Sequence, residues 1–187
     1  MLRVDPTQWS YKNICNKILE YETQGYNVEV VMVDYLTMLP TTGCINTGPV
    51  GSDKRDLYRR LRNFMSSKSI TFITPTQVST EGKNLIRGGM PEGDFVKEIA
   101  EKGYFADCKQ LDQEVDLELY IHLVKQHKET YLTVQRGKHR VPTILSDEEK
   151  YFVLKFPKGM PIPEDLNDPD RVPMRKIPSR AVTNASD

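Results

Sequence analysis

Residues 28–39 read Val-Glu-Val-Val-Met-Val-Asp-Tyr-Leu-Thr-Met-Leu, and this stretch constrains the fold more than any other part of the chain. Five of the six residues before Asp34 are apolar, and four of these are valine. Such a run is typical of a strand buried on both faces, as in the centre of a parallel α/β sheet. Open α/β sheets bind ligands at the carboxyl ends of their strands. Asp34 is therefore either a Walker B carboxylate, which holds a nucleotide's magnesium through water, or an acidic turn residue.

The composition favours one globular domain without a general affinity for nucleic acid. The chain has 187 residues, of which 38% are hydrophobic and 28% charged, so it can bury a sizeable core. Lysine plus arginine number 26 and so do aspartate plus glutamate, which means that only a local basic patch could bind nucleic acid. No apolar run is long enough to span a membrane and the N-terminus has no signal-peptide pattern, so we expect a cytoplasmic protein without membrane contacts. Three widely spaced cysteines favour reduced, structural thiols.

A helix is predicted before the valine-rich strand. Thr7 or Ser10 can cap its start, apolar residues then recur at helical spacing, and Gly25 suits the position just after its end. A helix that feeds a buried strand is one half of a βαβ unit. The strand expected before this helix is not in the sequence.

Residues 40–53 are rich in glycine and proline and predict a long loop, followed by a helix at about 53–67 that Ser52 or Asp53 caps. The polar faces of this helix carry five cations, which admit two interpretations. They are a solvated surface, or they lie near the phosphate of a substrate or a neighbouring subunit. These cations are Lys54, Arg55, Arg59, Arg60 and Arg62.

A second buried strand is predicted at 70–78, with Pro75 marking its end because proline cannot donate to a central ladder. If this strand runs parallel to the first, Gln77 lies at the same sheet edge as Asp34. An amide at that edge can sense a γ-phosphate or orient water, although a glutamine at a strand end can also be a plain turn residue. The next segments predict a flexible loop at 79–93 and a helix at 94–110 capped by Asp94. Residues 117–124 and 130–134 predict the two strands of a hairpin, and residues 151–156 a further short strand. Residues 157–187 predict a proline-rich arm or tail.

Four short motifs follow one another in the order found in a known family. They are Val33-Asp34-Tyr35-Leu36, Thr76-Gln77-Val78-Ser79, Leu111-Asp112-Gln113-Glu114-Val115-Asp116 and Lys138-His139-Arg140. They resemble, respectively, the Walker B strand, the Ser-Gln-Leu-Ser motif, the Ile-Glu-Gln-Asp-Ala-Asp stretch and the Lys-Gln-Arg element of hexameric replicative helicases of the DnaB type, in a bacteriophage version. The resemblance covers about residues 8–156 and leaves the tail unexplained.

The resemblance implies an α/β fold with a RecA-like sheet. Parallel core strands would be followed by a C-terminal antiparallel hairpin, with helices on both faces and without the P-loop strand. Residues 1–156 would form a partial helicase ATPase domain, and residues 157–187 the arm or tail. The implied function is ATP hydrolysis coupled to translocation on single-stranded DNA and duplex unwinding during DNA replication, in a homo-hexamer.

The resemblance also implies site residues, with ATP and Mg²⁺ as cofactors. Asp34 would bind Mg²⁺ through water, and Gln77 would couple the γ-phosphate to the DNA-facing loops. Arg140 would be an arginine finger that reaches the ATP of the next subunit, with Lys138 beside it, since a guanidinium both positions and neutralises a transferring phosphoryl group. An alternative register places Gln135-Arg136 on the family's Gln-Arg pair, but it puts valine where a lysine is expected.

The chain departs from the family at the phosphate site. No Gly-x-x-x-x-Gly-Lys-Ser/Thr motif occurs in it, and the catalytic glutamate cannot be assigned. Both would precede residue 1, so we expect a P-loop-bearing N-terminal part as a partner and an isolated chain without ATPase activity. At the place of the DNA-contacting Leu-Arg-Glu-Ser-Gly the chain has residues 105–109, where Lys109 is the nearest cation. Lys83 and Arg87 are further candidates for DNA contact.

Three functions therefore stay open. The chain is the C-terminal part of a helicase, or a P-loop-less RecA-like module that binds DNA or a helicase without catalysis. The third alternative is a recombinase or circadian-clock-type ATPase of the same superfamily. A P-loop encoded just upstream would decide for the helicase.

Overall fold

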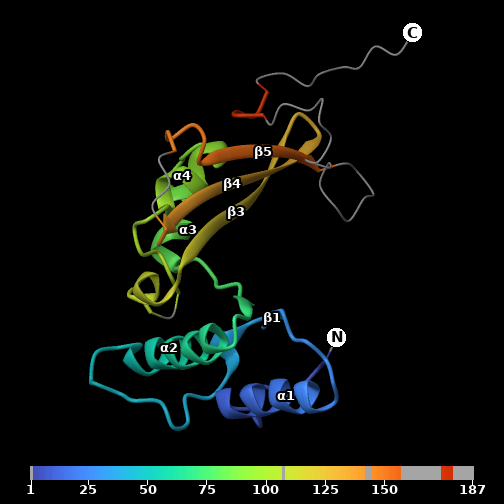
Figure 1. Ribbon diagram of the computed structural model, residues 1–187. Coiled ribbons are helices and arrows are strands. Elements are labelled where there is room, and N and C mark those ends of the chain that lie inside the picture. Colours follow the sequence, from blue (N-terminus) through green and yellow to red (C-terminus); the bar gives the residue numbers. More distant parts are fainter. Residues whose placement is uncertain (1, 107, 142–144, 157–173, 179–187) are drawn as a thin grey trace. The chain divides into compact units, whose positions relative to one another are not determined.

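A computed structural model of the chain describes residues 2–106, 108–141, 145–156 and 174–178. The chain forms two compact units. The first unit takes residues 1–80 and 103–115, and the second takes residues 81–102 and 116–187. Helices, a parallel pair of strands and a three-stranded antiparallel sheet make up the described part, which confirms the predicted α/β class (Figure 1).

The first unit is built on two parallel strands and two helices. Strands β1 (Val30–Met32) and β2 (Thr71–Ile73) pair in register from Val30 opposite Thr71 to Met32 opposite Ile73. Helices α1 (Tyr11–Thr23) and α2 (Ser52–Ser67) pack against each other, and α2 also packs against β2. The short 3₁₀ helices η1 (Leu36–Met38) and η3 (Leu111–Glu114) complete the described elements of this unit.

The core of the first unit lies between the helices and one face of the strands. The inward side of α2 and α1 is apolar at helical spacing, and Val31 and Phe72 of the strands pack against it. The late segment 103–115 adds two more buried side chains, so the core joins parts of the sequence that lie far apart. The buried core residues are Ile14, Ile18, Leu36, Leu39, Leu57, Tyr58, Leu61, Met65, Ile70, Cys108 and Leu111.

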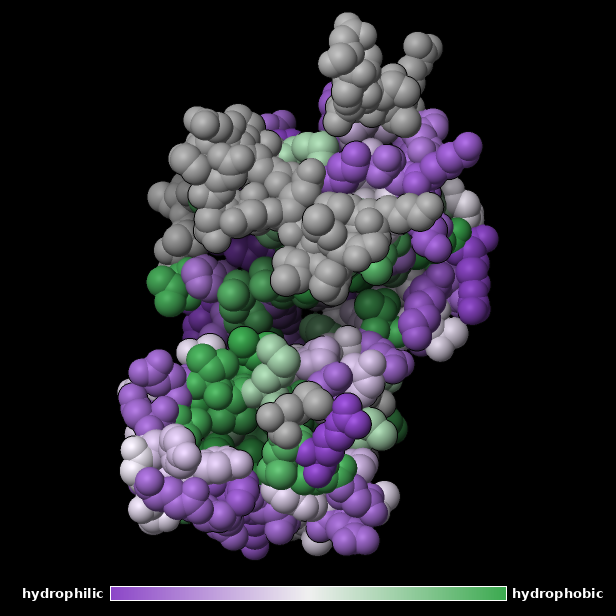
Figure 2. Space-filling view, turned by 90° about the vertical axis from the view of Figure 1, so that its right-hand side faces the viewer, coloured by the Kyte–Doolittle hydropathy of each residue, from purple (hydrophilic) through white to green (hydrophobic). Residues whose placement is uncertain are grey.

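The prediction that the strands at 28–33 and 70–78 are buried on both faces is wrong. The regular strands are only three residues long each, and Val30 and Met32 are 58% and 67% exposed. Within the described residues each strand has a single neighbour, and the helices cover one face only. Apolar residues consequently reach the surface of the first unit, the lower part of Figure 2.

The helix ends follow local sequence signals. Ser10 is the N-cap of α1, and its backbone N–H donates to the side chain of Asn13 at 2.9 Å. Gly25 has a φ of 89° just beyond the helix, as expected for a left-handed stop that favours glycine. Helix α2 begins one residue earlier than predicted, with Gly51 rather than Ser52 or Asp53 as its N-cap.

The second unit is built on an antiparallel sheet in the order β3-β4-β5. Strands β3 (Leu117–Gln126) and β4 (Glu129–His139) form the predicted hairpin, and β5 (Tyr151–Phe156) has the predicted bounds. His127 and Lys128 make the hairpin turn with φ values of 51° and 66°. Strand β4 is longer than the predicted 130–134, so Lys138 lies within the strand and Arg140 just beyond its end.

Helices of the second unit differ from the prediction in two places. Residues 80–87 form helix α3 (Thr80–Arg87) and residues 92–94 the 3₁₀ helix η2 (Glu92–Asp94), where a flexible loop was expected. Helix α4 (Phe95–Ile99) packs on β3 and β4 but ends far short of residue 110. Glu101 and Gly103 both have positive φ, which interrupts a right-handed helix.

The predicted arm at 157–187 is described only at residues 174–178, and the rest of that prediction lies outside the described residues. Met174 forms a bridge with Val153 of β5, and Arg175 donates to the carbonyl oxygen of Tyr151 at 2.8 Å. This short piece therefore packs on the antiparallel sheet. None of the helices in the part of the chain that is described has the length and apolarity to cross a membrane.

Candidate functional site at the carboxyl edge of the parallel strands

The carboxyl ends of β1 and β2 meet at one edge because the strands are parallel. The pairing continues past β1, where the N–H of Val33 donates to the carbonyl oxygen of Ile73 at 3.0 Å. Asp34 follows directly and is exposed, with a cis peptide bond to Tyr35. Gln77 follows the end of β2 by four residues. The predicted adjacency of these two strand ends is confirmed.

Thr74 fixes the backbone on both sides of Asp34. Its hydroxyl donates to the carbonyl oxygen of Val33 at 2.8 Å and accepts from the N–H of Leu36 at 3.3 Å. The Asp34 turn is thus held by the end of the neighbouring strand. Thr74 was not among the predicted site residues, although a hydroxyl side chain next to the proline that ends a predicted strand is a usable signal.

Lys54 fastens the segment that follows Asp34 to helix α2. Its ammonium group donates to the carbonyl oxygens of Thr37 at 2.7 Å and Leu39 at 3.0 Å. These two carbonyls lie in and just after η1, which leaves them without helical partners of their own. The lysine therefore stabilises the carboxyl edge instead of facing a phosphate.

The segment with Gln77 is tied to residues 104–106 by backbone contacts. The N–H of Ala106 donates to the Gln77 carbonyl oxygen at 3.0 Å, and the N–H of Ser79 donates to the Tyr104 carbonyl oxygen at 2.8 Å. Between them Val78 and Phe105 form an isolated antiparallel bridge. The Gln77 side chain is exposed to solvent, whereas its backbone is held by these hydrogen bonds.

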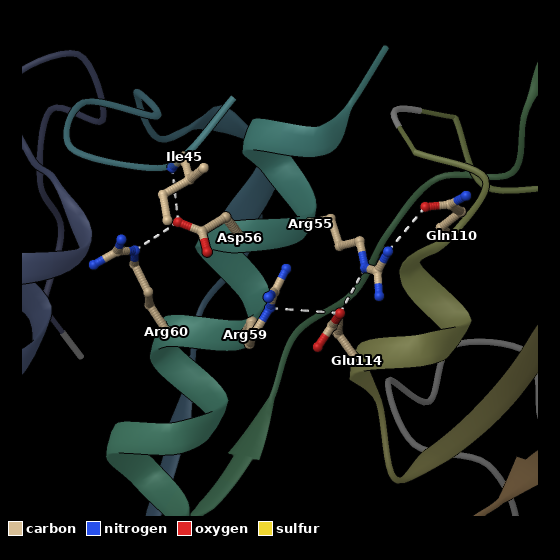
Figure 3. A network of polar contacts seen from close by, with 7 residues as sticks. All are labelled: Ile45, Arg55, Asp56, Arg59, Arg60, Gln110 and Glu114. Atoms are coloured by element: carbon tan, nitrogen blue, oxygen red, sulfur yellow. Dashed lines mark hydrogen bonds and ion pairs between the residues drawn. The ribbon is translucent and has the colours of Figure 1, made fainter. Parts of the chain in front are cut away.

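Three cations of α2, Arg55, Arg59 and Arg60, are engaged within the first unit, as Figure 3 shows. Arg55 contacts Glu114 at 2.6 Å, and Arg59 approaches the same carboxylate oxygen at 3.7 Å. Arg55 also donates to the side chain of Gln110 at 3.0 Å. Glu114 is only 7% exposed, so these contacts join α2 to the late segment of the unit. This part of the basic face has a structural role.

Asp56 anchors the loop that leads into α2. Its carboxylate accepts from the N–H of Ile45 at 2.8 Å and from the Nε of Arg60 at 2.6 Å (Figure 3). Burial opposes ionisation, but the hydrogen bonds from Arg60 and Ile45 outweigh it, so the pKa of Asp56 lies below its ordinary value. The charged carboxylate therefore stabilises the fold, and Arg60 has a structural role as its ion-pair partner.

The second unit holds the predicted cations Lys138 and Arg140. The Nε of Arg140 contacts a carboxylate oxygen of Asp116 at 2.8 Å, and its N–H donates to the Asp116 carbonyl oxygen at 2.7 Å. The backbone N–H of Lys138 donates to the side chain of Glu118 at 3.3 Å. The Arg140 side chain is thus paired with Asp116, just before β3, and the Lys138 backbone is bonded to Glu118 of β3.

The alternative finger, Arg136, has a different setting. It lies inside β4 opposite Leu119, and its N–H donates to the carbonyl oxygen of Lys150 at 2.8 Å. Arg136 is half-buried, whereas Arg140 is exposed just beyond the strand end.

The residues proposed for DNA contact do not come together within one unit. Lys83 and Arg87 lie one turn apart on α3 in the second unit, and both are exposed. Lys109 is exposed in the first unit, next to the buried Cys108. Their role in DNA binding stays a prediction.

Among the described residues, no three histidine, cysteine, aspartate or glutamate side chains gather as a metal site. A single exposed carboxylate at a strand end still fits Mg²⁺, because this ion keeps several waters and takes its other ligands from phosphates. Asp34 meets that requirement.

A profile of divergent DnaB-like ATPases matches residues 1–186. The chain belongs to this divergent DnaB-like ATPase family. The resemblance drawn from the four motifs is thereby confirmed at the level of the family. No curated protein matches the sequence.

Proposed function

We propose that this DnaB-like ATPase is the C-terminal part of a replicative DNA helicase, which couples ATP hydrolysis to translocation on single-stranded DNA in a homo-hexamer. The parallel pairing of β1 and β2 carries the proposal, because it brings the carboxyl ends of the strands that precede Asp34 and Gln77 to one sheet edge. Family membership supports ATP as the nucleotide. The P-loop would come from another segment of the complete assembly.

In this proposal the chain's own residues position and neutralise, which is what phosphoryl transfer requires. Bound ATP and Mg²⁺ supply the phosphoryl group and most of the countercharge. Asp34 would orient the waters of the metal, and the Thr74 hydroxyl keeps its turn in place. Gln77 would report the γ-phosphate to residues 104–106 through the backbone bonds that join the two segments.

Arg140 would act on the nucleotide of a neighbouring subunit. It is exposed at the end of β4, and its pair with Asp116 is exposed as well, with side-chain exposures of 46% and 57%. Exposed ion pairs contribute little to stability, so this contact leaves the guanidinium able to bind a phosphate at a subunit interface. The half-buried Arg136 has no such freedom, and this difference supports the register with Lys138 and Arg140.

The test is a mixing experiment in the assembled complex. Asp34→Asn and Arg140→Ala should each abolish most hydrolysis, and the finger variant should lose about 10³-fold or more in turnover. Mixed hexamers of the two variants should recover activity at interfaces where an intact finger meets an intact Asp34. If demonstrably mixed hexamers stay inactive at every ratio, Arg140 does not act on a neighbour. If Arg136→Ala is the lethal change, the register is shifted.

A second candidate is a non-catalytic module that binds DNA or a helicase. The absence of Gly-x-x-x-x-Gly-Lys-Ser/Thr from the 187 residues favours it. Under both candidates the chain by itself should neither bind ATP at micromolar concentrations nor hydrolyse it. Adding a P-loop-bearing partner separates the candidates, because only the helicase part gains DNA-stimulated hydrolysis.

A further inference from the structure

The two cations at the end of β4 are held by a local irregularity of the hairpin. Leu117 pairs with His139, but Leu119 pairs with Arg136. One residue of β3 therefore faces two residues of β4, which is the arrangement of a β-bulge at Gly137 and Lys138. Bulges bend a strand and change the direction of its side chains.

Glu118 is the single residue opposite the bulge. Its carboxylate accepts from the N–H of Lys138 at 3.3 Å and from the hydroxyl of Tyr120 at 3.2 Å, and the residue is only 7% exposed. Gly137 fits this arrangement because a Cβ there would lie 2.6 Å from the Tyr120 ring and 3.0 Å from the Glu118 carboxylate. The bulge is thus closely packed, and the buried Glu118 carboxylate accepts a hydrogen bond from the amide of Lys138.

Asp116 holds Arg140 two residues beyond the bulge. One contact joins the backbones, at 2.7 Å, and the other joins the carboxylate to Nε, at 2.8 Å. Nε is the nitrogen closest to the side-chain stem, so a contact there restricts the plane of the guanidinium. Asp116, just before β3, therefore contacts the Arg140 guanidinium, and Glu118 contacts the backbone amide of Lys138.

We propose that Asp116 and Glu118 are positioning residues for phosphate recognition by Arg140 and Lys138. Asp116 sets the orientation of the Arg140 guanidinium, and Glu118 maintains the bulge that determines the direction of Lys138. The inference rests on the proposed function for the role of the cations. The contacts themselves concern the second unit alone and can be tested in the isolated chain.

The first test measures hydrogen exchange in the isolated chain by nitrogen-15 NMR. The Nε–H of Arg140 should exchange about 2- to 5-fold faster in Asp116→Asn than in the wild type, the range expected for an exposed pair. The backbone amide of Lys138 should exchange about 5-fold faster in Glu118→Gln, which loses a charge-assisted acceptor. The control is Glu129→Gln, which removes the pair with Lys155 at the other end of the hairpin. If neither rate changes, the positioning contacts do not exist in solution and the inference is overturned.

The second test measures ATP turnover in the assembled complex. Asp116→Asn should lower kcat about 3- to 10-fold with KM for ATP unchanged, since orientation matters in the transition state. Asp116→Glu should restore part of the loss. The difference from wild type should shrink at high salt, which screens exposed pairs.

The outcomes separate this inference from the proposed function. If Arg140→Ala keeps wild-type turnover, the proposed function fails, and the exchange rates alone decide whether the two acids hold the cations. If Arg140→Ala is inactive while Asp116→Asn and Glu118→Gln turn over like the Glu129→Gln control, the finger stands and the inference is wrong.

Discussion

Replacing Asp56 with alanine should destabilise the first unit by about 2 kcal/mol. The carboxylate is 5% exposed and accepts from Ile45 at 2.8 Å and from Arg60 at 2.6 Å. A part-buried amide left without an acceptor costs about 1–3 kcal/mol, which sets the magnitude. Arg60 is about one-third exposed and regains water, so we assign little of the loss to its pair.

The chain carries its own probe for this measurement. Trp9 is the single tryptophan, and it packs against the core of the first unit. Its fluorescence in a urea titration should show a lower midpoint for Asp56→Ala, with an unchanged slope. Asp147→Ala is the control, because that carboxylate is 97% exposed in the second unit and its loss should leave the midpoint where it is.

The contribution of Asp56 to the free energy of unfolding should depend on pH, in a direction that its lowered pKa determines. Because the pKa of Asp56 in the folded chain lies below its ordinary value of 3.8, its contribution is complete above that value. It is lost as the pH falls through the lower, folded pKa. The stability gap between wild type and Asp56→Asn should therefore be constant near neutral pH and close below about pH 4. A gap that is absent at pH 7, or that grows on acidification, would refute the reasoning.

Three further substitutions test other parts of the fold. Leu61→Ala removes a side chain with 0% exposure and should cost about 2–5 kcal/mol in the Trp9 titration. Gly137→Ala should destabilise the second unit by about 1–3 kcal/mol, seen by circular dichroism, because the new methyl group would overlap the Tyr120 ring; an unchanged melt would mean that the bulge relaxes at no cost. Thr74→Val should speed amide exchange at Leu36 while preserving shape, and an unaltered rate would show that the hydroxyl does not hold the Asp34 turn.

Local signals in the sequence predicted where helices and strands lie better than they predicted which faces of those elements are buried. The apolar run before Asp34 indicated a strand and its end, yet not the exposure of Val30 and Met32, because burial depends on neighbours that the run does not encode. Helix α3 was missed because a short helix among glycines leaves too few turns for a periodic pattern. The hairpin was predicted correctly from two runs of β-branched and aromatic residues.

The candidate site shows the same division. The prediction that Asp34 and Gln77 share a sheet edge assumed that the two strands are parallel. The structure confirms the parallel pairing. The contacts of Lys54 and Asp116 could not be predicted, since each joins residues that no periodicity relates. The sequence left two interpretations for the cations of α2. Their ion pairs could not be predicted, because the partner Glu114 lies 59 residues after Arg55.

The interleaving of the two units has a consequence for the order in which the chain can fold. The first unit draws on residues 103–115, so its core lacks Cys108 and Leu111 until the chain beyond residue 80 has looped out and returned. A fragment that ends at Thr80 would expose that gap and leave Arg55 without Glu114. During synthesis from the N-terminus, the first unit therefore stays incomplete while residues 81–102 emerge. The β3–β4 hairpin, whose contacts are local, can form as soon as its own residues appear.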